Sequence, residues 1–171
     1  MTQGPHGTSD ELWDGVALLV GRVVIEASRL EFVAAGAMYA LLASQVGSAV
    51  TTGQSWSFVY QSSLKLIETR ERLVRATGGD VTPYPAMRTT FERANKLMDQ
   101  RNEVVHGFWF PAGENPDGLP QTALQKRSGP PRMSKWSPDQ LAQLRTDIRA
   151  SVEQLGALMG RLAQLHPVAA H

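Results

Sequence analysis

Hydrophobic residues recur at helical intervals in four segments of the chain, 10–43, 54–76, 85–106 and 137–165. This periodicity predicts four helices of one all-α bundle. The first segment has a line of apolar residues at near-helical spacing: Leu12, Val16, Leu19, Val23, Leu30, Val33 and Leu41. Further apolar residues, such as Val20, Val24 and Ile25, lie beside this line, so the helix is apolar over more than one face. A helix of this breadth is expected to be covered on two sides, by its own bundle and by a partner subunit. The sequence therefore predicts a homodimer through the first and third helices.

The second helix, 54–76, ends at Thr77-Gly78, where glycine suits the left-handed turn that follows many helices. Its predicted core positions are Val59, Leu66, Ile67, Leu73 and Val74.

The third helix, 85–106, carries a charge within its apolar line. The predicted line consists of Met87, Phe91, Ala94, Met98, Val105 and, just after the helix, Phe108. Arg101 falls on this line. Because an unpaired buried charge is costly, Arg101 needs a carboxylate partner, a cavity or a subunit interface.

Residues 108–136 are rich in proline, glycine and polar residues and form a long insertion before the last helix. Residues 107–110 and 122–125 are predicted to pair as a short β-hairpin around 115–118. The last helix has a clear start, since Ser137 is an N-cap, Pro138 fits the first turn and Gln140 completes a capping box. The predicted fold is an up-and-down four-helix bundle with a Pro/Gly-rich loop or small hairpin between the third and last helices.

A length of 171 residues fits one domain, 1–171, with tails at 1–9 and 167–171. The formal net charge of +1 gives no global attraction for nucleic acid. The absence of cysteine excludes disulfides, thiolate nucleophiles and cysteine-ligated zinc. The N-terminus lacks the features of a secretory signal, and the uncharged run 32–64 stops being apolar near Ala43. We therefore expect a cytoplasmic chain without membrane contact.

The insertion is locally basic and contains aromatic residues, which is a composition suited to single-stranded nucleic acid. The candidate RNA-binding residues are Lys126, Arg127, Arg132, Lys135 and Trp109. An ordinary surface loop with solvated cations explains the same composition, and both interpretations stay open at this point.

The segment Arg101-Asn102-Glu103-Val104-Val105-His106 combines an arginine, an amide and a histidine at a helix end. Asn102 and His106 are four residues apart and share a face of the helix. Arg101 and His106 are five residues apart, so they are separated by about 140° around the helix and about 7.5 Å along its axis. Arg101 and His106 converge if the arginine reaches round the helix, if the last turn is distorted, or if two subunits pair the segment.

An arginine and a histidine are sufficient for metal-free phosphodiester transfer in RNA. The histidine takes a proton from the 2′-hydroxyl or gives one to the leaving 5′-oxygen, and the arginine holds the phosphate. Asn102 is placed to orient the imidazole or bind a phosphate oxygen. His6, His166 and His171 lack ligand spacing with carboxylates, so the sequence predicts neither a metal nor a cofactor.

The same segment resembles the R-[polar]-x-x-x-H signature of the HEPN domain family, small helical bundles of bacteria and archaea, and its Gly107-Phe108-Trp109 continuation is similar to uncharacterised bacterial HEPN-like proteins. The resemblance implies a metal-independent endoribonuclease that forms a 2′,3′-cyclic phosphate, with Arg101 and His106 catalytic and Asn102 supporting. It also implies a composite cleft across a homodimer. Active members include toxins and phage-defence effectors, so an antitoxin or defence protein is a candidate partner.

Phe108 departs from the branch of the family that carries a tyrosine two residues after the histidine for nucleotide attachment. Two alternatives to catalysis stay open. One is a non-catalytic module that binds RNA, nucleotide or protein. The other is a structural bundle, in which Glu26, on the same face as Arg22 and Arg29, neutralises Arg101, and His106 only caps its helix.

Overall fold

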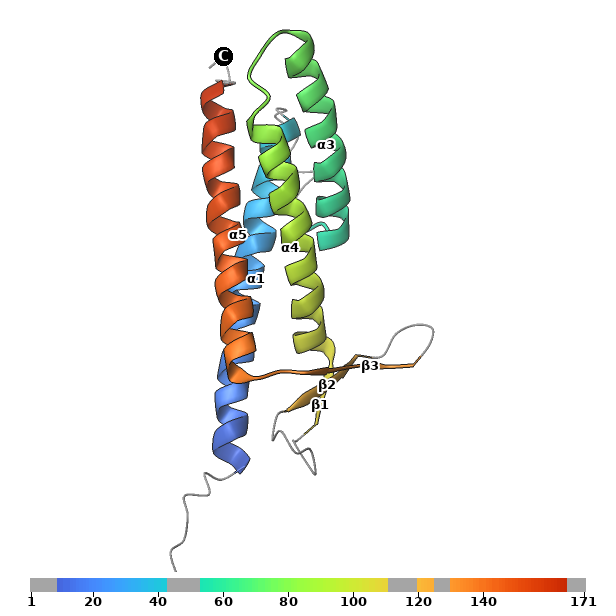
Figure 1. The fold of residues 1–171 in the computed structure, drawn as a ribbon, viewed down its shortest axis with the longest axis vertical. Helices are drawn as coiled ribbons and strands as arrows, with labels where there is room; N and C mark the ends of the chain where they lie inside the picture. Colours follow the sequence, from blue (N-terminus) through green and yellow to red (C-terminus); the bar gives the residue numbers. More distant parts are fainter. Residues whose placement is uncertain (1–8, 43–52, 111–119, 125–129, 166–171) are drawn as a thin grey trace, which may run out of the picture.

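The computed structural model describes residues 9–42, 53–110, 120–124 and 130–165. Residues 1–8 of the predicted N-terminal tail at 1–9, the predicted C-terminal tail at 167–171 and the predicted hairpin turn at 115–118 lie outside these residues. Ser9 is the first residue of a helix and not part of the tail. The described residues form four helices and a small sheet. The helices lie side by side along the long axis, with the sheet at one end (Figure 1). The elements are α1 (Ser9–Leu42), α3 (Trp56–Ala76), α4 (Pro83–His106), β1 (Phe108–Phe110), β2 (Gln121–Leu124), β3 (Arg132–Lys135) and α5 (Pro138–Leu165).

The helices begin and end close to the predicted residues because local chemistry marks their ends. Before α5, the backbone N–H of Ser137 donates to Gln140 Oε1 (2.7 Å) and the backbone N–H of Gln140 donates to Ser137 Oγ (3.1 Å), which confirms the capping box. Gly78, after α3, has a φ of 71°, as predicted for the turn that ends this helix. α4 begins two residues earlier than predicted, at Pro83.

The helices do not alternate in direction. α1, α3 and α5 run the same way and α4 runs against them (Figure 1). Arg70, late in α3, donates to the carbonyl oxygens of Leu41 (2.7 Å) and Leu42 (3.0 Å) at the end of α1, as parallel neighbours require. The predicted up-and-down order is therefore wrong for α1 and α3. Alternation follows only from short connections, and α3 begins beside the middle of α1, not beside its end.

The hydrophobic core lies among the four helices, and α4 contributes its largest buried side chains, including Tyr84, Met87 and Phe91. The prediction is wrong for two residues expected in the core, since Leu73 is 56% exposed and Phe108 is 70% exposed. Near the end of α4, Val104 is fully buried and Val105 only half-buried, so the buried side is shifted by one residue.

A buried carboxylate joins α1 to α5. Glu26 is 3% exposed, and it accepts hydrogen bonds from Arg149 (2.5 Å) and Arg29 (3.3 Å), with Arg145 at 3.7 Å. The hydrogen bond from Arg149 lowers the pKa of Glu26 below its ordinary value of 4.5, against the opposing effect of burial. In the structural alternative drawn from the sequence, Glu26 neutralises Arg101; in the structure Glu26 instead pairs with Arg149 of α5 and Arg29 of α1.

The insertion forms an antiparallel sheet of order β1-β2-β3. The pairing of β1 with β2 confirms the predicted hairpin, while β3 was not predicted. Trp109, Thr122 and Ser134 lie in register on one face of the sheet, and Phe108, Ala123 and Met133 lie in register on the other. Among the described helices, none offers the apolar length that a membrane-spanning segment requires.

Candidate functional site at the end of α4

Arg101, Asn102 and His106 come together within one protomer, in the last two turns of α4. Nη1 of Arg101 donates to Oδ1 of Asn102 (3.0 Å) and lies 3.4 Å from Nε2 of His106. The guanidinium thus reaches round the helix to the imidazole, which is the first of the three predicted routes. A second subunit is not needed to bring the two side chains together.

The contact between Arg101 and His106 defines the form of the imidazole that fits it. A guanidinium has only donors, so a hydrogen bond between the two groups requires Nε2 of His106 to accept. His106 is exposed at the helix end, where reactants have access to it. The structure therefore places an exposed imidazole beside a fixed positive charge.

Arg101 has no carboxylate within ion-pair distance among the described residues, whereas several surface arginines do. The side chain is half-buried, and its Nε is buried without a hydrogen-bond partner. Arginine stays charged at all physiological pH values, so the guanidinium keeps its affinity for an anion. The negative end of the α4 dipole offers only partial compensation.

Between the site residues, Glu103 fixes the end of α4 to the sheet. This carboxylate is 5% exposed, pairs with Nη1 of Arg132 (2.6 Å) and accepts from Oγ of Ser134 (3.0 Å), both on β3. On β1, Nε1 of Trp109 donates to the carbonyl oxygen of Val104 (2.8 Å). These bonds hold β1 and β3 against the helix turn that carries His106.

Gly107 permits this close packing. A Cβ atom at this position would lie 2.4 Å from the carbonyl oxygen of Glu103 and 2.9 Å from Cβ of Thr122, both too close for a side chain. Its backbone is extended (φ −73°), so glycine is required here by space and not by a left-handed conformation.

The three predicted RNA-binding residues that the structure describes lie on two opposite faces of the sheet, Trp109 and Arg132 on one and Lys135 on the other. Lys126 and Arg127 lie outside the described residues. Arg132 is engaged by Glu103. Trp109 is half-buried, with its ring edge-to-face against Trp13 at 6.5 Å, so its ring faces are not open to a base. Lys135 is exposed on the outer face of the sheet, in register with Gln121.

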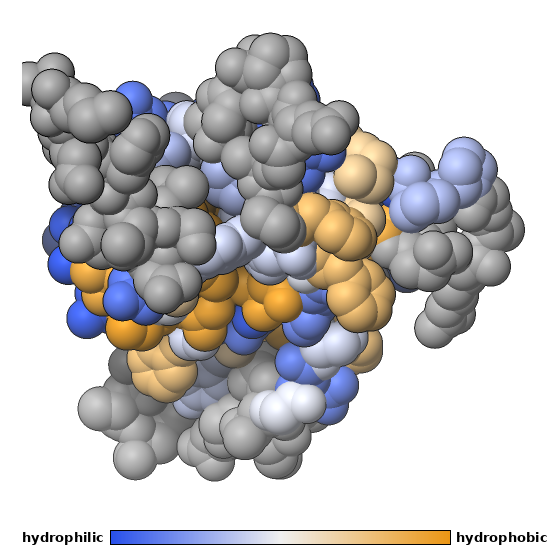
Figure 2. All heavy atoms as spheres, turned by 90° about the horizontal axis from the view of Figure 1, so that it is seen from below, coloured by the Kyte–Doolittle hydropathy of each residue, from blue (hydrophilic) through white to orange (hydrophobic). Residues whose placement is uncertain are grey.

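Sequence reasoning missed the exposed apolar face of the sheet, which we call the outer sheet face. It consists of Phe108 (70% exposed), Phe110 (48%) and Met133 (54%). The buried Ala123 of the central strand β2 lies on the same face, in register between Phe108 and Met133. Viewed from the end that carries the sheet, the surface shows orange hydrophobic side chains beside blue polar ones (Figure 2). The alternation of Phe108, Trp109 and Phe110 was a usable signal, because a strand must turn the two phenylalanines to the same side.

The comparisons with known proteins add no assignment, since no family model, no curated protein and no solved structure matches the chain. Within the described ranges, no group of three or more His, Cys, Asp or Glu side chains is arranged to hold a metal ion. The interpretation of the site therefore rests on its own geometry.

Proposed function

We propose that the protein is a metal-independent endoribonuclease with its reactive centre at Arg101 and His106. The observation that carries the proposal is the 3.4 Å approach of the Arg101 guanidinium to Nε2 of the exposed His106, without a carboxylate paired to Arg101 among the described residues. A half-buried arginine with a purely structural role is expected to pair with a carboxylate. The buried carboxylates of this protein show such pairs, Glu26 with Arg149 and Glu103 with Arg132.

The proposed reaction is transesterification within the RNA. When the phosphate draws the Arg101 guanidinium away from Nε2 of His106, this nitrogen takes the proton of a 2′-hydroxyl, and the 2′-oxygen bonds to the adjacent phosphorus. The bond from phosphorus to the 5′-oxygen breaks, the resulting imidazolium returns a proton to that oxygen, and the products are a 2′,3′-cyclic phosphate and a 5′-hydroxyl. Arg101 stabilises the charge that develops on the non-bridging oxygens, and Asn102 holds one end of the guanidinium.

The outer sheet face supplies a surface for the RNA beside this centre. Phe108 is two residues from His106, and its ring is open for stacking with an unpaired base. Lys135 lies in register with Gln121 of β2 and Phe110 of β1, and it adds a positive charge to the same face. These residues favour single-stranded RNA, because bases within a duplex are not free to stack on a protein ring.

The test is cleavage of a labelled single-stranded RNA in excess EDTA, comparing wild-type protein with His106→Ala, Arg101→Ala and the exposed control Lys96→Ala. We expect His106→Ala to reduce the rate roughly 10²–10⁴-fold, since this is the range for losing a general acid–base group. Arg101→Ala should act similarly, and Lys96→Ala should have no effect. A 2′-O-methyl substrate should resist cleavage, and the product should carry a 2′,3′-cyclic phosphate. Cleavage that persists in His106→Ala would show that the assignment is wrong.

The second candidate is a module that binds RNA, nucleotide or protein without catalysis, which the outer sheet face alone supports. It predicts wild-type binding of single-stranded RNA with no cyclic-phosphate product. A role as toxin or phage-defence effector, with an antitoxin or defence partner, stays a prediction that depends on the resemblance to HEPN proteins.

A further inference from the structure

A line of large hydrophobic side chains lies on the outside of α1, and we call it the α1 stripe. It consists of Leu18 (56% exposed), Ile25 (56%), Phe32 (81%) and Tyr39 (42%). Successive members are seven residues apart, so they lie on nearly the same side of the helix, over a length of about 32 Å. The bundle core takes other positions of α1, including Val23, Leu30 and Ala37.

Small residues accompany the stripe at the same interval. Gly21, Ser28 and Ala35 each follow a large member by three residues, which gives the spacing of the contact positions in a coiled coil. This spacing fits the stripe to a second helix with an apolar line of the same period, rather than to an irregular surface.

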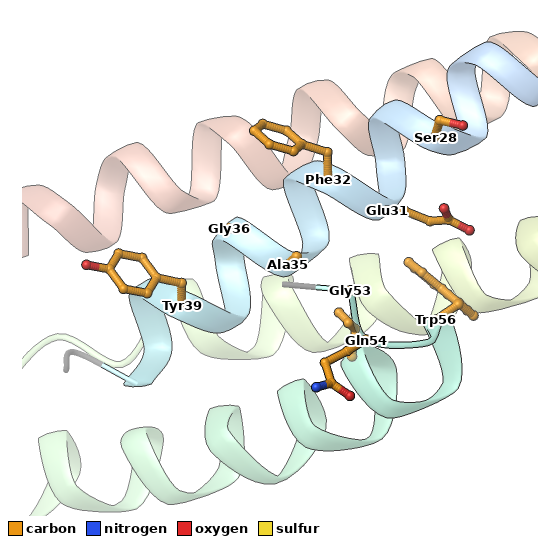
Figure 3. A pocket seen from close by; sticks show the side chains of 10 residues that line it. Ser28, Glu31, Phe32, Ala35, Gly36, Tyr39, Gly53, Gln54 and Trp56 are labelled. Atoms are coloured by element: carbon orange, nitrogen blue, oxygen red, sulfur yellow. The ribbon is translucent and has the colours of Figure 1, made fainter. Parts of the chain in front are cut away.

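A pocket of about 530 Å³ opens beside the middle of the stripe, between α1 and the start of α3. Ser28, Ala35 and Gly36 contribute to one wall and Trp56 to the other, while Phe32 and Tyr39 project from α1 at its edge (Figure 3). A protruding phenyl ring and a pocket able to receive one are therefore next to each other on the same surface. A two-fold axis through this patch sets each Phe32 against the pocket of the other copy.

We propose that the occupant of the α1 stripe is a second copy of this chain, with the two α1 helices antiparallel and each Phe32 in the partner's pocket. In a parallel pair, Phe32 meets Phe32 and Gly21 meets Gly21, so layers are alternately crowded and empty. In an antiparallel pair with its axis between Phe32 and Ala35, Phe32 faces Ala35 of the second copy and Tyr39 faces Ser28, so large side chains meet small ones around the axis. By contrast, no large hydrophobic residue of α4 is exposed, so the earlier prediction of an interface on that helix has no apolar surface to support it.

This dimer has a consequence for the candidate site. The pocket is lined by the second half of α1, from Ser28 to Tyr39. That half of α1 lies away from the sheet, whereas the end of α4, the helix that carries Arg101 and His106, adjoins the sheet (Figure 1). An antiparallel two-fold at the pocket therefore sends the two sites to opposite ends of the dimer. Each site works alone, and the inference is independent of the proposed ribonuclease activity.

The first test is the mass of the full chain in solution by light scattering at micromolar concentration. We expect a dimer for wild type and a monomer for Phe32→Asp and Ile25→Asp. Leu73→Asp is the matched control, because Leu73 on α3 has the same exposure as Ile25 (56%) and lies outside the stripe; it should stay dimeric. Helical circular dichroism checks that each variant folds. A monomeric wild type, or a dimer that persists in both stripe variants, overturns the proposal.

The second test exploits the absence of cysteine in the chain. Single variants Ala35→Cys and Leu18→Cys are treated with a short bismaleimide. Ala35→Cys, near the proposed axis, should form a covalent dimer, while Leu18→Cys should not, since the antiparallel copies carry it far apart. Cross-linking of both variants would indicate a parallel pair, and cross-linking of neither would exclude this face; either result overturns the proposal. RNA cleavage by Phe32→Asp, measured per chain, reports separately on the ribonuclease assignment.

Discussion

At the scale of single residues, Arg101 differs from the other charged groups that α1 and α4 bury. Glu26 is compensated by arginines of α1 and α5, and Glu103 by Arg132 and Ser134. Arg101 contacts Asn102 and His106, and no carboxylate of the described residues lies within ion-pair distance of it. The sequence singled out the same three candidate residues that lie together in the structure. It was not sufficient to show how Arg101 and His106 meet, because helical geometry separates them and the side-chain conformation of a long arginine depends on its surroundings.

The buried carboxylate of Glu26 should make stability depend on acidity. Its pKa is lowered in the folded state, chiefly by the hydrogen bond from Arg149, so the unfolded chain binds the proton at a higher pH. The stabilisation is therefore complete above the ordinary value of 4.5 and is lost as the pH falls through the lowered pKa. We expect Glu26→Gln to lower the free energy of unfolding at pH 7 by about 1.5–3 kcal/mol, the range for a hydrogen bond to a charged group.

Urea unfolding of wild type and Glu26→Gln between pH 7 and pH 3 measures this effect. The difference between the two proteins should shrink as the medium becomes acidic. Glu68→Gln, which removes an exposed pair with Arg72, is the control and should change stability little at any pH. A difference of constant size across the range would contradict the role of ionised Glu26.

At the scale of elements, the sheet and the end of α4 form one unit through Gly107. We expect Gly107→Ala to destabilise the protein by about 1–3 kcal/mol, as for an added group in a packed region, because its Cβ would collide with Glu103 and Thr122. Gly160→Ala is the control, since no atom lies near the added Cβ, and alanine in this exposed helical position should stabilise by about 0.5–1 kcal/mol. Thermal unfolding of the two variants measures these changes in stability, and near-ultraviolet circular dichroism reports on their packing. If Gly107→Ala is as stable as wild type, the sheet is able to move aside.

The same elements show which signals a sequence carries. Capping chemistry at Ser137 and Gln140 is local, and it predicted the start of α5 correctly. The strand β3 is only four residues long, and its role depends on Arg132 and Ser134 reaching Glu103 about thirty residues earlier in the chain. Such a long-range contact has no periodicity, so β3 emerged only from the structure.

At the scale of the whole molecule, the direction of α3 was the main error in the predicted fold. The number of helices follows from the apolar periodicity, but their directions depend on where each connection returns the chain. The hydrogen bonds from Arg70 to Leu41 and Leu42 identify α1 and α3 as parallel neighbours. This arrangement also creates the pocket beside Phe32, because the start of α3 meets the middle of α1.

The parallel arrangement leaves two apolar surfaces at separate places, the outer sheet face and the α1 stripe, and they should act independently. We expect Phe108→Ala to weaken binding of single-stranded RNA by about 5–150-fold, the equivalent of about 1–3 kcal/mol for one stacked base. Phe32→Asp should leave the affinity for RNA unchanged and should only convert the dimer to a monomer, as measured by its mass in solution. Because the sites are far apart and share no partners, the double variant should show the sum of the two single effects on binding free energy. Fluorescence anisotropy with labelled RNA measures all four proteins; a loss of RNA affinity in Phe32→Asp as large as in Phe108→Ala would mean that dimerisation forms part of the RNA-binding surface.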